Sequence, residues 1–182
     1  MPSNIYQMKK YFLVSIFLLL STMNCLSQNS LLFKDGKNYK ATPILEFICD
    51  DYVYDNILKV QIAKTAKGGI LKLAIKTSGT QVKISDKVLL ILKNGAIIHC
   101  LDKNFNDATE TESIAYYLLS NLEMLQLRNQ NIENIRFRII GKTLRFGSPI
   151  GHFTANNKDT NFSLDKNLKS KYDTVSEIKL LN

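Results

Sequence analysis

A histidine, a cysteine and an aspartate stand close together in the segment NGAIIHCLDK, at His99, Cys100 and Asp102. All three residue types bind metal ions, and a histidine beside a cysteine can activate the thiol as a nucleophile. Asn94-Gly95 opens the segment and separates two apolar runs, which is the strongest short signal for a β-hairpin. Whether the three side chains can act together therefore depends on the strand that carries them.

Strand geometry separates the histidine from the cysteine. A two-residue turn of type I′ would place Leu89 opposite Cys100 and Leu90 opposite His99. Successive side chains of a strand point to opposite faces of the sheet. His99 and Cys100 then point apart and cannot share a metal ion or form a nucleophile–base pair. We interpret His99 as a structural histidine and expect no metal site in this segment.

The two runs of this hairpin, VLLILK and AIIHCLDK, are apolar almost throughout. Such runs are typical of strands buried on both faces, so we place them centrally in a sheet. Four other segments alternate apolar and polar residues, which predicts half-buried antiparallel strands. These segments are ILEFICDD, ILKVQIAK, ILKLAIKT and IENIRFRII. Glycines in TAKGG join the second and third segments as a hairpin.

One short helix is predicted before the last of these strands. Ser120 is its expected N-cap, with Glu123 completing a capping box, and Leu122 and Leu125 are expected to face inward. Beyond about residue 147 the signals are weaker: GHFTANN suggests one more strand, and TVSEIKLL a helical turn capped by Thr174. The sequence predicts a single mainly β domain, antiparallel and β-sandwich-like, with one inserted helix.

The first segment encodes export. Lys9 and Lys10 precede an apolar run over residues 11–20, and small and polar residues follow. This order is that of a secretory signal peptide, and the run is shorter than the roughly 20 apolar residues that span a bilayer. Met8 is a candidate start. We expect residues 1–27 to be removed, which leaves residues 28–182 without a membrane span, in the periplasm or at the cell surface.

Lipidation of Cys25 is the alternative processing route. A lipobox normally carries an aliphatic residue and a small residue where this chain has Thr22 and Asn24. The sequence therefore favours cleavage after Ser27. A lipid-anchored structural protein of the envelope remains the alternative.

The cysteines of the exported domain are Cys49 and Cys100. Alternation places both side chains inward, and cysteines outside the cytoplasm are most often paired. We predict a Cys49–Cys100 disulfide, whose loop of roughly 50 residues would stabilise the fold by about 4 kcal/mol. Two buried free thiols, or a metal site that includes His152, are the alternatives.

The charge of the chain is positive. It falls from +8 to +6 without residues 1–27, because that segment carries two lysines and no acid. No basic block alternates with aromatic residues, so we expect no nucleic-acid binding. Five cations on outward strand faces are the candidate binding residues: Lys59, Lys72, Lys76, Arg136 and Arg138. An anionic glycan or an envelope protein would suit them, and nothing predicts a cofactor.

Catalytic signatures are absent from the sequence. It contains no GxSxG, HExxH, CxxC or dinucleotide-binding motif. The alternative enzymatic interpretation is a metal-dependent hydrolase that combines His152 with Asp50, Asp51 and Asp55. We favour a non-catalytic exported domain that binds a protein or a glycan.

The segments FICDDYVYDN, VQIAKT, GGILKLAI, GAIIHCLDK and NIRFRIIGK together resemble a family of small, uncharacterised exported proteins of Bacteroidota. The resemblance covers most of the exported domain. It implies export and the domain plan given above, and it implies no activity, ligand or catalytic residue.

Overall fold

The computed structural model describes residues 29–50, 55–77, 81–141, 150–158 and 171–181. The predicted signal peptide, Cys25 and Asp51 lie outside the described residues. Most of the described chain forms one nine-stranded antiparallel sheet. Its strands are β3 (Leu45–Cys49), β4 (Ile57–Thr65), β5 (Gly68–Lys76), β6 (Val82–Leu92), β7 (Ile97–Cys100), β8 (Phe105–Ala108), β9 (Glu112–Ser120), β10 (Ile132–Gly141) and β11 (Gly151–Asn156).

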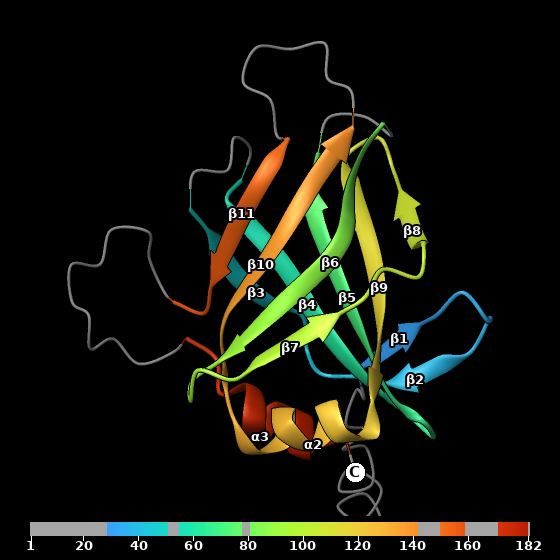
Figure 1. The fold of residues 1–182 in the computed structure, drawn as a ribbon. Coiled ribbons are helices and arrows are strands. Elements are labelled where there is room, and N and C mark those ends of the chain that lie inside the picture. The colour runs from blue at the N-terminus through green and yellow to red at the C-terminus, as the bar shows by residue number, and fades with distance from the viewer. Residues whose placement is uncertain (1–28, 51–54, 78–80, 142–149, 159–170, 182) are drawn as a thin grey trace, which may run out of the picture.

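The sheet is strongly curved. Its strand order is β7-β6-β10-β11-β3-β4-β5-β9-β8, and the curvature turns the half with β6 and β10 toward the half with β4 and β5 (Figure 1). The main core lies between these halves and draws buried side chains from both of them. The predicted mainly antiparallel β class is therefore confirmed.

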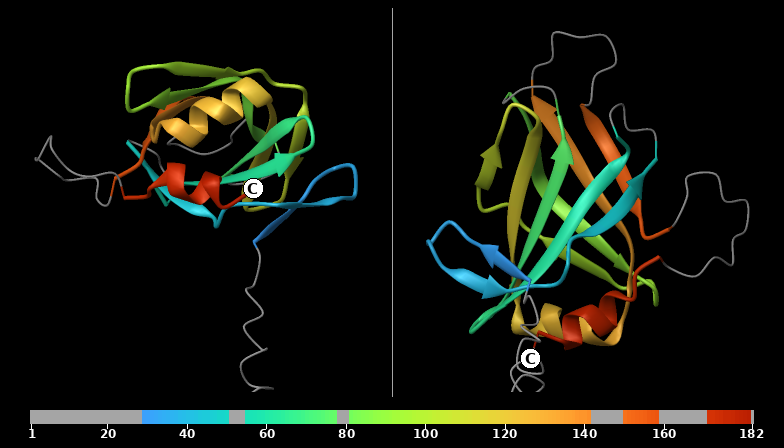
Figure 2. Two further views of the ribbon diagram at one scale, coloured as in Figure 1. Left: turned by 90° about the horizontal axis from the view of Figure 1, so that it is seen from below. Right: turned by 180° about the vertical axis from the view of Figure 1, so that it is seen from behind.

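Two helices and a small hairpin complete the fold. Helices α2 (Asn121–Asn129) and α3 (Thr174–Lys179) lie side by side across one end of the sheet (Figure 2). Strands β1 (Ser30–Leu32) and β2 (Asn38–Lys40) form a separate antiparallel pair. This pair covers part of the outer face of the sheet, in a second apolar cluster that includes Leu31, Ala63 and Tyr116.

The hairpin of β4 and β5 forms as predicted, and its strands pair from Thr65 opposite Gly68 to Leu58 opposite Ile75. The predicted half-buried character is wrong for part of its length, because several residues of the other face are buried as well: Gln61, Ala63, Ile70 and Ala74. Gly68 has φ +138, and a Cβ at this position would lie 2.0 Å from the Leu119 carbonyl oxygen. Only glycine fits this close approach of β5 to β9.

The hairpin of β6 and β7 corrects the predicted register by one residue. Leu89 pairs with His99, and Val88 pairs with Cys100. The Leu92 N–H donates to the Ala96 carbonyl at 2.9 Å, so the loop has three residues. Gly95 has φ +82, whereas a type I′ turn would also require positive φ at the preceding residue. The separation of the two chemical groups is confirmed, because His99 is exposed and Cys100 is buried.

The prediction that this hairpin lies centrally and is buried on both faces is wrong. Strand β7 is an edge of the sheet and pairs only with β6. Its outward residue Ile97 is 49% exposed, and Leu101, just beyond the strand, is 59% exposed. Apolar content alone therefore overstated the burial of this strand.

Helix α2 begins at the predicted residue, but it buries a different face from the one predicted. The Ser120 hydroxyl accepts from the Glu123 N–H at 3.3 Å, and the Glu123 carboxylate accepts from the Ser120 N–H at 2.7 Å. The buried residues are Met124 and Leu127, while the predicted inward pair, Leu122 and Leu125, is exposed. Two residues of a helix turn through about 200°, so docking Met124 inward turns Leu122 toward solvent.

The last segment matches its weak signals. The predicted strand is β11, and the predicted helical turn is α3. The N-cap of α3 is Asp173, whose carboxylate accepts from the Ser176 N–H at 3.2 Å, and not Thr174 as predicted. The buried Thr174 hydroxyl instead accepts from the Ile132 N–H at 2.9 Å, which attaches α3 to the start of β10.

Candidate functional site

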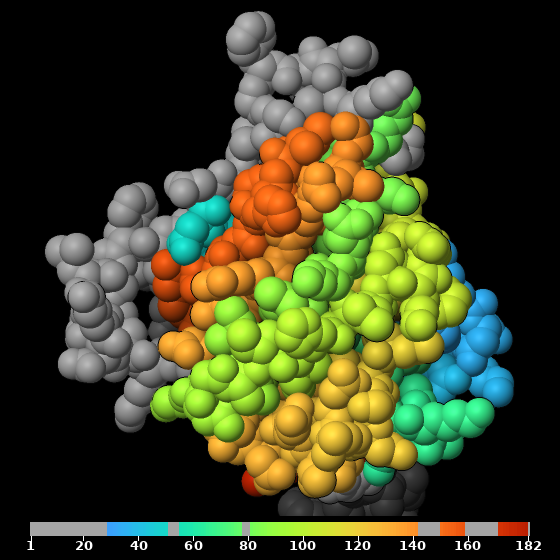
Figure 3. Space-filling model, viewed as in Figure 1, coloured from blue at the N-terminus to red at the C-terminus, as the bar shows by residue number. Residues whose placement is uncertain are grey.

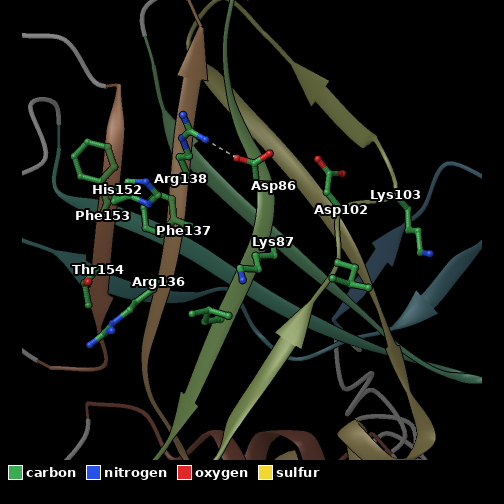
Figure 4. Close-up of a pocket in the computed structure, with 12 residues that line it drawn as sticks. Asp86, Lys87, Asp102, Lys103, Arg136, Phe137, Arg138, His152, Phe153 and Thr154 are labelled. Atoms are coloured by element: carbon green, nitrogen blue, oxygen red, sulfur yellow. Dashed lines mark hydrogen bonds and ion pairs between the residues drawn. The ribbon is translucent and has the colours of Figure 1, made fainter.

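An open groove of about 970 Å³ lies where β6, β10 and β11 run side by side, next to the chain that leaves β7 (Figure 4). On the surface, this region occupies the face formed by these strands (Figure 3). The residues that line it are Asp86, Lys87, Leu89, Leu101, Asp102, Lys103, Arg136, Phe137, Arg138, His152, Phe153 and Thr154. The groove therefore collects residues from four separate parts of the sequence.

A β-bulge in β6 shapes one side of the groove. Ser85 pairs with Arg138 and Leu89 pairs with Arg136, so β6 has three residues where β10 has only Phe137. Asp86 has φ +63, which is uncommon for a residue other than glycine. Bulges redirect side chains from the regular ladder, and Asp86 and Lys87 are both exposed here. The sequence SDK interrupts the apolar pattern, but β6 continues through it and pairs with β10 on both sides of the bulge.

The bulge brings Asp86 to Arg138. The Arg138 Nη1 atom lies 2.9 Å from the Asp86 Oδ2 atom, and both side chains are about half exposed. This ion pair holds one of the two predicted arginines at the upper part of the groove in Figure 4. Arg138 is therefore partly neutralised by its neighbour.

Arg136 lies lower in the groove and is differently placed. Its neighbours across the ladders are Leu89 on β6 and Thr154 on β11, and its side chain is exposed beside Thr154 (Figure 4). Among the described residues, no hydrogen bond or ion pair involves the Arg136 guanidinium. A guanidinium has five N–H donors in a planar fork, and these remain available to a ligand.

The charges of the groove favour an anion. Four cations, Lys87, Lys103, Arg136 and Arg138, stand against the two acids Asp86 and Asp102, which leaves a formal excess of two positive charges. His152 adds an exposed imidazole on β11, opposite Arg138 in the ladder. The half-buried Leu89 and the exposed Leu101 supply apolar contact area. The groove thus suits a negatively charged ligand with an apolar face.

The predicted cationic stripe is divided between two surfaces. Arg136 and Arg138 line the groove, whereas Lys59, Lys72 and Lys76 lie on β4 and β5. Strands β11 and β3 stand between β10 and β4 in the sheet. The Lys59 ammonium also lies 2.6 Å from the Glu112 carboxylate, and this hydrogen bond raises the pKa of Lys59. The structure therefore brings together two of the five predicted cations.

The residues of the alternative hydrolase site are not brought together. His152 stands opposite Arg138, near one end of β11. Asp50 is held near the other end, where it accepts from Asn156 at 2.7 Å and pairs with Lys158 at 3.0 Å. The Asp55 carboxylate accepts from the Ile57 N–H in the turn before β4. Within the described ranges, no three histidine, cysteine or acidic side chains are grouped to hold a metal ion.

The cysteine prediction also needs correction. Cys49 and Cys100 are buried in the main core as predicted, but both are free thiols. They lie on β3 and β7, which three strands separate in the sheet order. Burial raises the pKa of each thiol to about 12. Thiols held in the protonated form are poor nucleophiles.

Eight lining residues were not among the sequence candidates: Asp86, Lys87, Leu89, Leu101, Lys103, Phe137, Phe153 and Thr154. The interruption of the apolar pattern at SDK was a signal for two of them, Asp86 and Lys87. Comparison of the chain with protein-family models, with curated proteins and with solved structures finds no match. In the part of the chain that the structure describes, no helix has the length and apolar character needed to cross a membrane.

Proposed function

We propose that this protein is an exported, non-catalytic binding module whose groove accepts an acidic saccharide. The observation that carries the proposal is the Arg136 guanidinium, which is exposed in a cationic groove and has no partner among the described residues. Export is expected from the sequence of residues 1–27. An exported protein meets glycans of the envelope and of its surroundings.

The size and shape of the groove favour a small ligand over a flat protein interface. Its volume of about 970 Å³ falls in the range of roughly 300–1,000 Å³ that is typical of ligand pockets. A sugar ring has hydroxyl groups at its edge and C–H groups on its faces. The Thr154 hydroxyl can hydrogen-bond to the sugar hydroxyl groups, and Leu89 and Leu101 can pack against the C–H faces of the ring.

The arginine specifies the charge of the ligand. A guanidinium binds a planar carboxylate or a sulfate through paired charge-assisted hydrogen bonds. Lys87 and Lys103 can add attraction without fixed geometry, since an ammonium acts as a point charge. The shared chemistry is therefore a saccharide that carries carboxylate or sulfate groups.

A binding panel tests the proposal. Purified protein is titrated with uronate-bearing oligosaccharides, with their carboxyl-reduced counterparts, and with a sulfated series and its desulfated counterparts. We expect at least one acidic series to bind about tenfold more tightly than its neutral counterpart, which corresponds to about 1.4 kcal/mol. Preference for one series identifies the anion. Equal binding of every acidic and neutral pair would contradict the proposal.

A further inference from the structure

Strand β7 leaves one edge of the sheet unpaired. In the described chain it pairs with β6 alone, and no second strand is hydrogen-bonded to it, although β9 approaches it across the curved sheet. An edge strand presents main-chain donors and acceptors that can template another strand. Lys93, Ile97 and His99 of this edge lie outside the groove, whereas Leu101 and Lys103, just beyond β7, also line the groove.

The hairpin hydrogen bonds show which groups are free. The Leu92 N–H donates to the Ala96 carbonyl, so these two residues form a hydrogen-bonded pair. Antiparallel ladders alternate hydrogen-bonded and non-hydrogen-bonded pairs. The pairs of Ile97 with Ile91 and of His99 with Leu89 are therefore of the second kind. The main-chain N–H and C=O groups of Ile97 and His99 point away from β6, toward the open side.

The opposite edge of the sheet, β8, is protected. The Lys34 ammonium contacts the Asn106 carbonyl at 2.5 Å and the Asp107 carboxylate at 2.9 Å. The ring of Phe33 also packs against Phe105, with ring centroids 5.5 Å apart. Charged side chains and covering loops are common means of blocking an edge. Among the described residues, no comparable ion pair or ring contact covers β7.

Apolar side chains surround the open edge. Ile97 and Leu101 are 49% and 59% exposed on the outer face. Helix α2 lies next to β7 on the same face of the molecule (Figure 3), and its outward residues Leu122 and Leu125 are 68% and 53% exposed. A strand added beside β7 would thus find apolar contacts from both the sheet and the helix.

Charge indicates the kind of partner. Lys93 and Lys103 are exposed and lie on either side of β7 along the chain. Self-association in the register that pairs Ile97 with His99 of a second copy would set Lys93 opposite Lys103. Like charges directly opposite each other destabilise a strand pair. An acidic strand would instead place opposite charges there.

We propose that the free edge of β7 binds an extended acidic peptide, which adds to the sheet as a further strand. Main-chain hydrogen bonds to Ile97 and His99 provide the affinity, as in other cases of strand addition. Alternate apolar side chains of the peptide contact Ile97 and Leu101 on the outer face. Its acidic residues pair with Lys93 and Lys103.

The test uses two synthetic nine-residue peptides, in which valine alternates with glutamate or with lysine. Binding is measured by fluorescence anisotropy, and amide hydrogen exchange is followed at Ile97 and His99. His99→Pro removes a free-edge N–H without removing a ladder hydrogen bond to β6, a position where proline is tolerated. Lys93→Glu reverses one flanking charge, and Lys72→Glu on β5 is the matched charge control.

The glutamate peptide should bind and slow exchange at both amides, and the lysine peptide should not. His99→Pro should weaken binding about tenfold or more, which corresponds to at least 1.4 kcal/mol. Lys93→Glu should also weaken binding of the glutamate peptide, and Lys72→Glu should bind it as the native protein does. Because Lys93→Glu leaves the strand intact, this variant tests the proposal even if the proline variant misfolds. Equal binding of the two peptides, or unchanged exchange at the edge amides, would overturn the proposal. A dimer of the protein alone that His99→Pro abolishes would overturn it too, by identifying a second copy as the occupant.

Discussion

Asp86 joins backbone geometry to charge at the groove. Its φ of +63 lies in the left-handed region, which costs a residue with a Cβ roughly 1–2 kcal/mol. Aspartate tolerates this region better than most residues. The carboxylate also pairs with Arg138 at 2.9 Å and so reduces the positive charge that a ligand would meet. Asp86 therefore shapes the bulge and moderates the charge of the groove.

Asp86→Gly separates these two roles. Glycine adopts the left-handed conformation readily, and an exposed ion pair contributes about 0–1 kcal/mol, so the free energy of unfolding should change by less than about 1 kcal/mol. Affinity for an acidic saccharide should increase, because an acid is removed and Arg138 is released. Urea unfolding and calorimetric titration measure the two effects. Asp107→Gly, which breaks the distant pair with Lys34, is the control and should leave ligand affinity unchanged. Weaker binding by Asp86→Gly would contradict this role.

The two core thiols make stability depend on alkaline pH. Burial raises the pKa of Cys49 and Cys100 to about 12, from an ordinary value of 9.0. Unfolded thiols lose protons above pH 9, while the folded ones hold theirs, so the unfolded state gains relative stability. The stability that the two protonated thiols contribute to the folded state is fully present below pH 9 and is lost as the pH rises toward 12.

A thiol reagent tests this account directly. Neither cysteine should react with a disulfide reagent at pH 8 in the folded protein, and both should react after unfolding. Cys49→Ala and Cys100→Ala should reduce the decline in stability above pH 9. Rapid labelling of the native protein, or recovery of an intact Cys49–Cys100 disulfide, would contradict the assignment of two buried free thiols.

At the scale of elements, two asparagines attach the C-terminal segment to the sheet and α2. The buried Asn157 side chain donates to the Ile132 and Tyr172 carbonyls at 3.0 and 2.9 Å and accepts from the Tyr172 N–H at 2.9 Å. Asn131 accepts from Thr174 and from the Val175 N–H. Side-chain amides thus supply the hydrogen bonds that no regular ladder provides here.

Asn157→Ala should lower the free energy of unfolding by about 2–4 kcal/mol, because one buried and two partly buried main-chain groups lose their partner. The matched control is Asn129→Ala. Its exposed amide makes a single bond, to Leu125, and its loss should cost less than about 1 kcal/mol. Urea unfolding measures both variants. Equal losses in the two would show that the Asn157 bonds do not hold the segment.

Elements with regular alternation were predictable from the sequence. Strands β3 and β10 follow their period-two patterns, and Ser120 begins α2 as expected. Strands β4 and β5 form where predicted but are buried on both faces over much of their length. Short polar strands such as β8, with the sequence FNDA, carry no such pattern and were missed. The one-residue error at β7 arose because the loop length depends on the φ of Asn94, which the dipeptide Asn-Gly does not determine.

At the scale of the whole molecule, the groove could not be predicted from local patterns. Arg136 and Arg138 were recognised as outward residues, but their neighbours come from β6, β11 and the segment after β7. Strand order and curvature determine such neighbours, and strands distant in sequence pair through them. The bulge at Asp86 adds a local irregularity that no periodicity encodes.

The proposed export of the full chain has its own test. Expressed in a bacterial host with an outer membrane, the chain should be recovered outside the cytoplasm and begin at Gln28. Cys25→Ser should leave both the location and the amino terminus unchanged. Fatty-acid labelling that this variant abolishes would contradict cleavage after Ser27 and identify the chain as a lipoprotein.

The role of Arg136 in the groove is tested most directly by one titration series. Calorimetry compares an acidic oligosaccharide with its neutral counterpart on the native protein, on Arg136→Gln and on the control Lys72→Gln. Arg136→Gln should lower the affinity for the acidic ligand about tenfold or more, because a charge-assisted hydrogen bond contributes about 1.5–3 kcal/mol. The affinity for the neutral ligand should not change. Lys72→Gln should bind as the native protein does. Unchanged affinity of Arg136→Gln for the acidic ligand would contradict the assignment of the groove as the binding site.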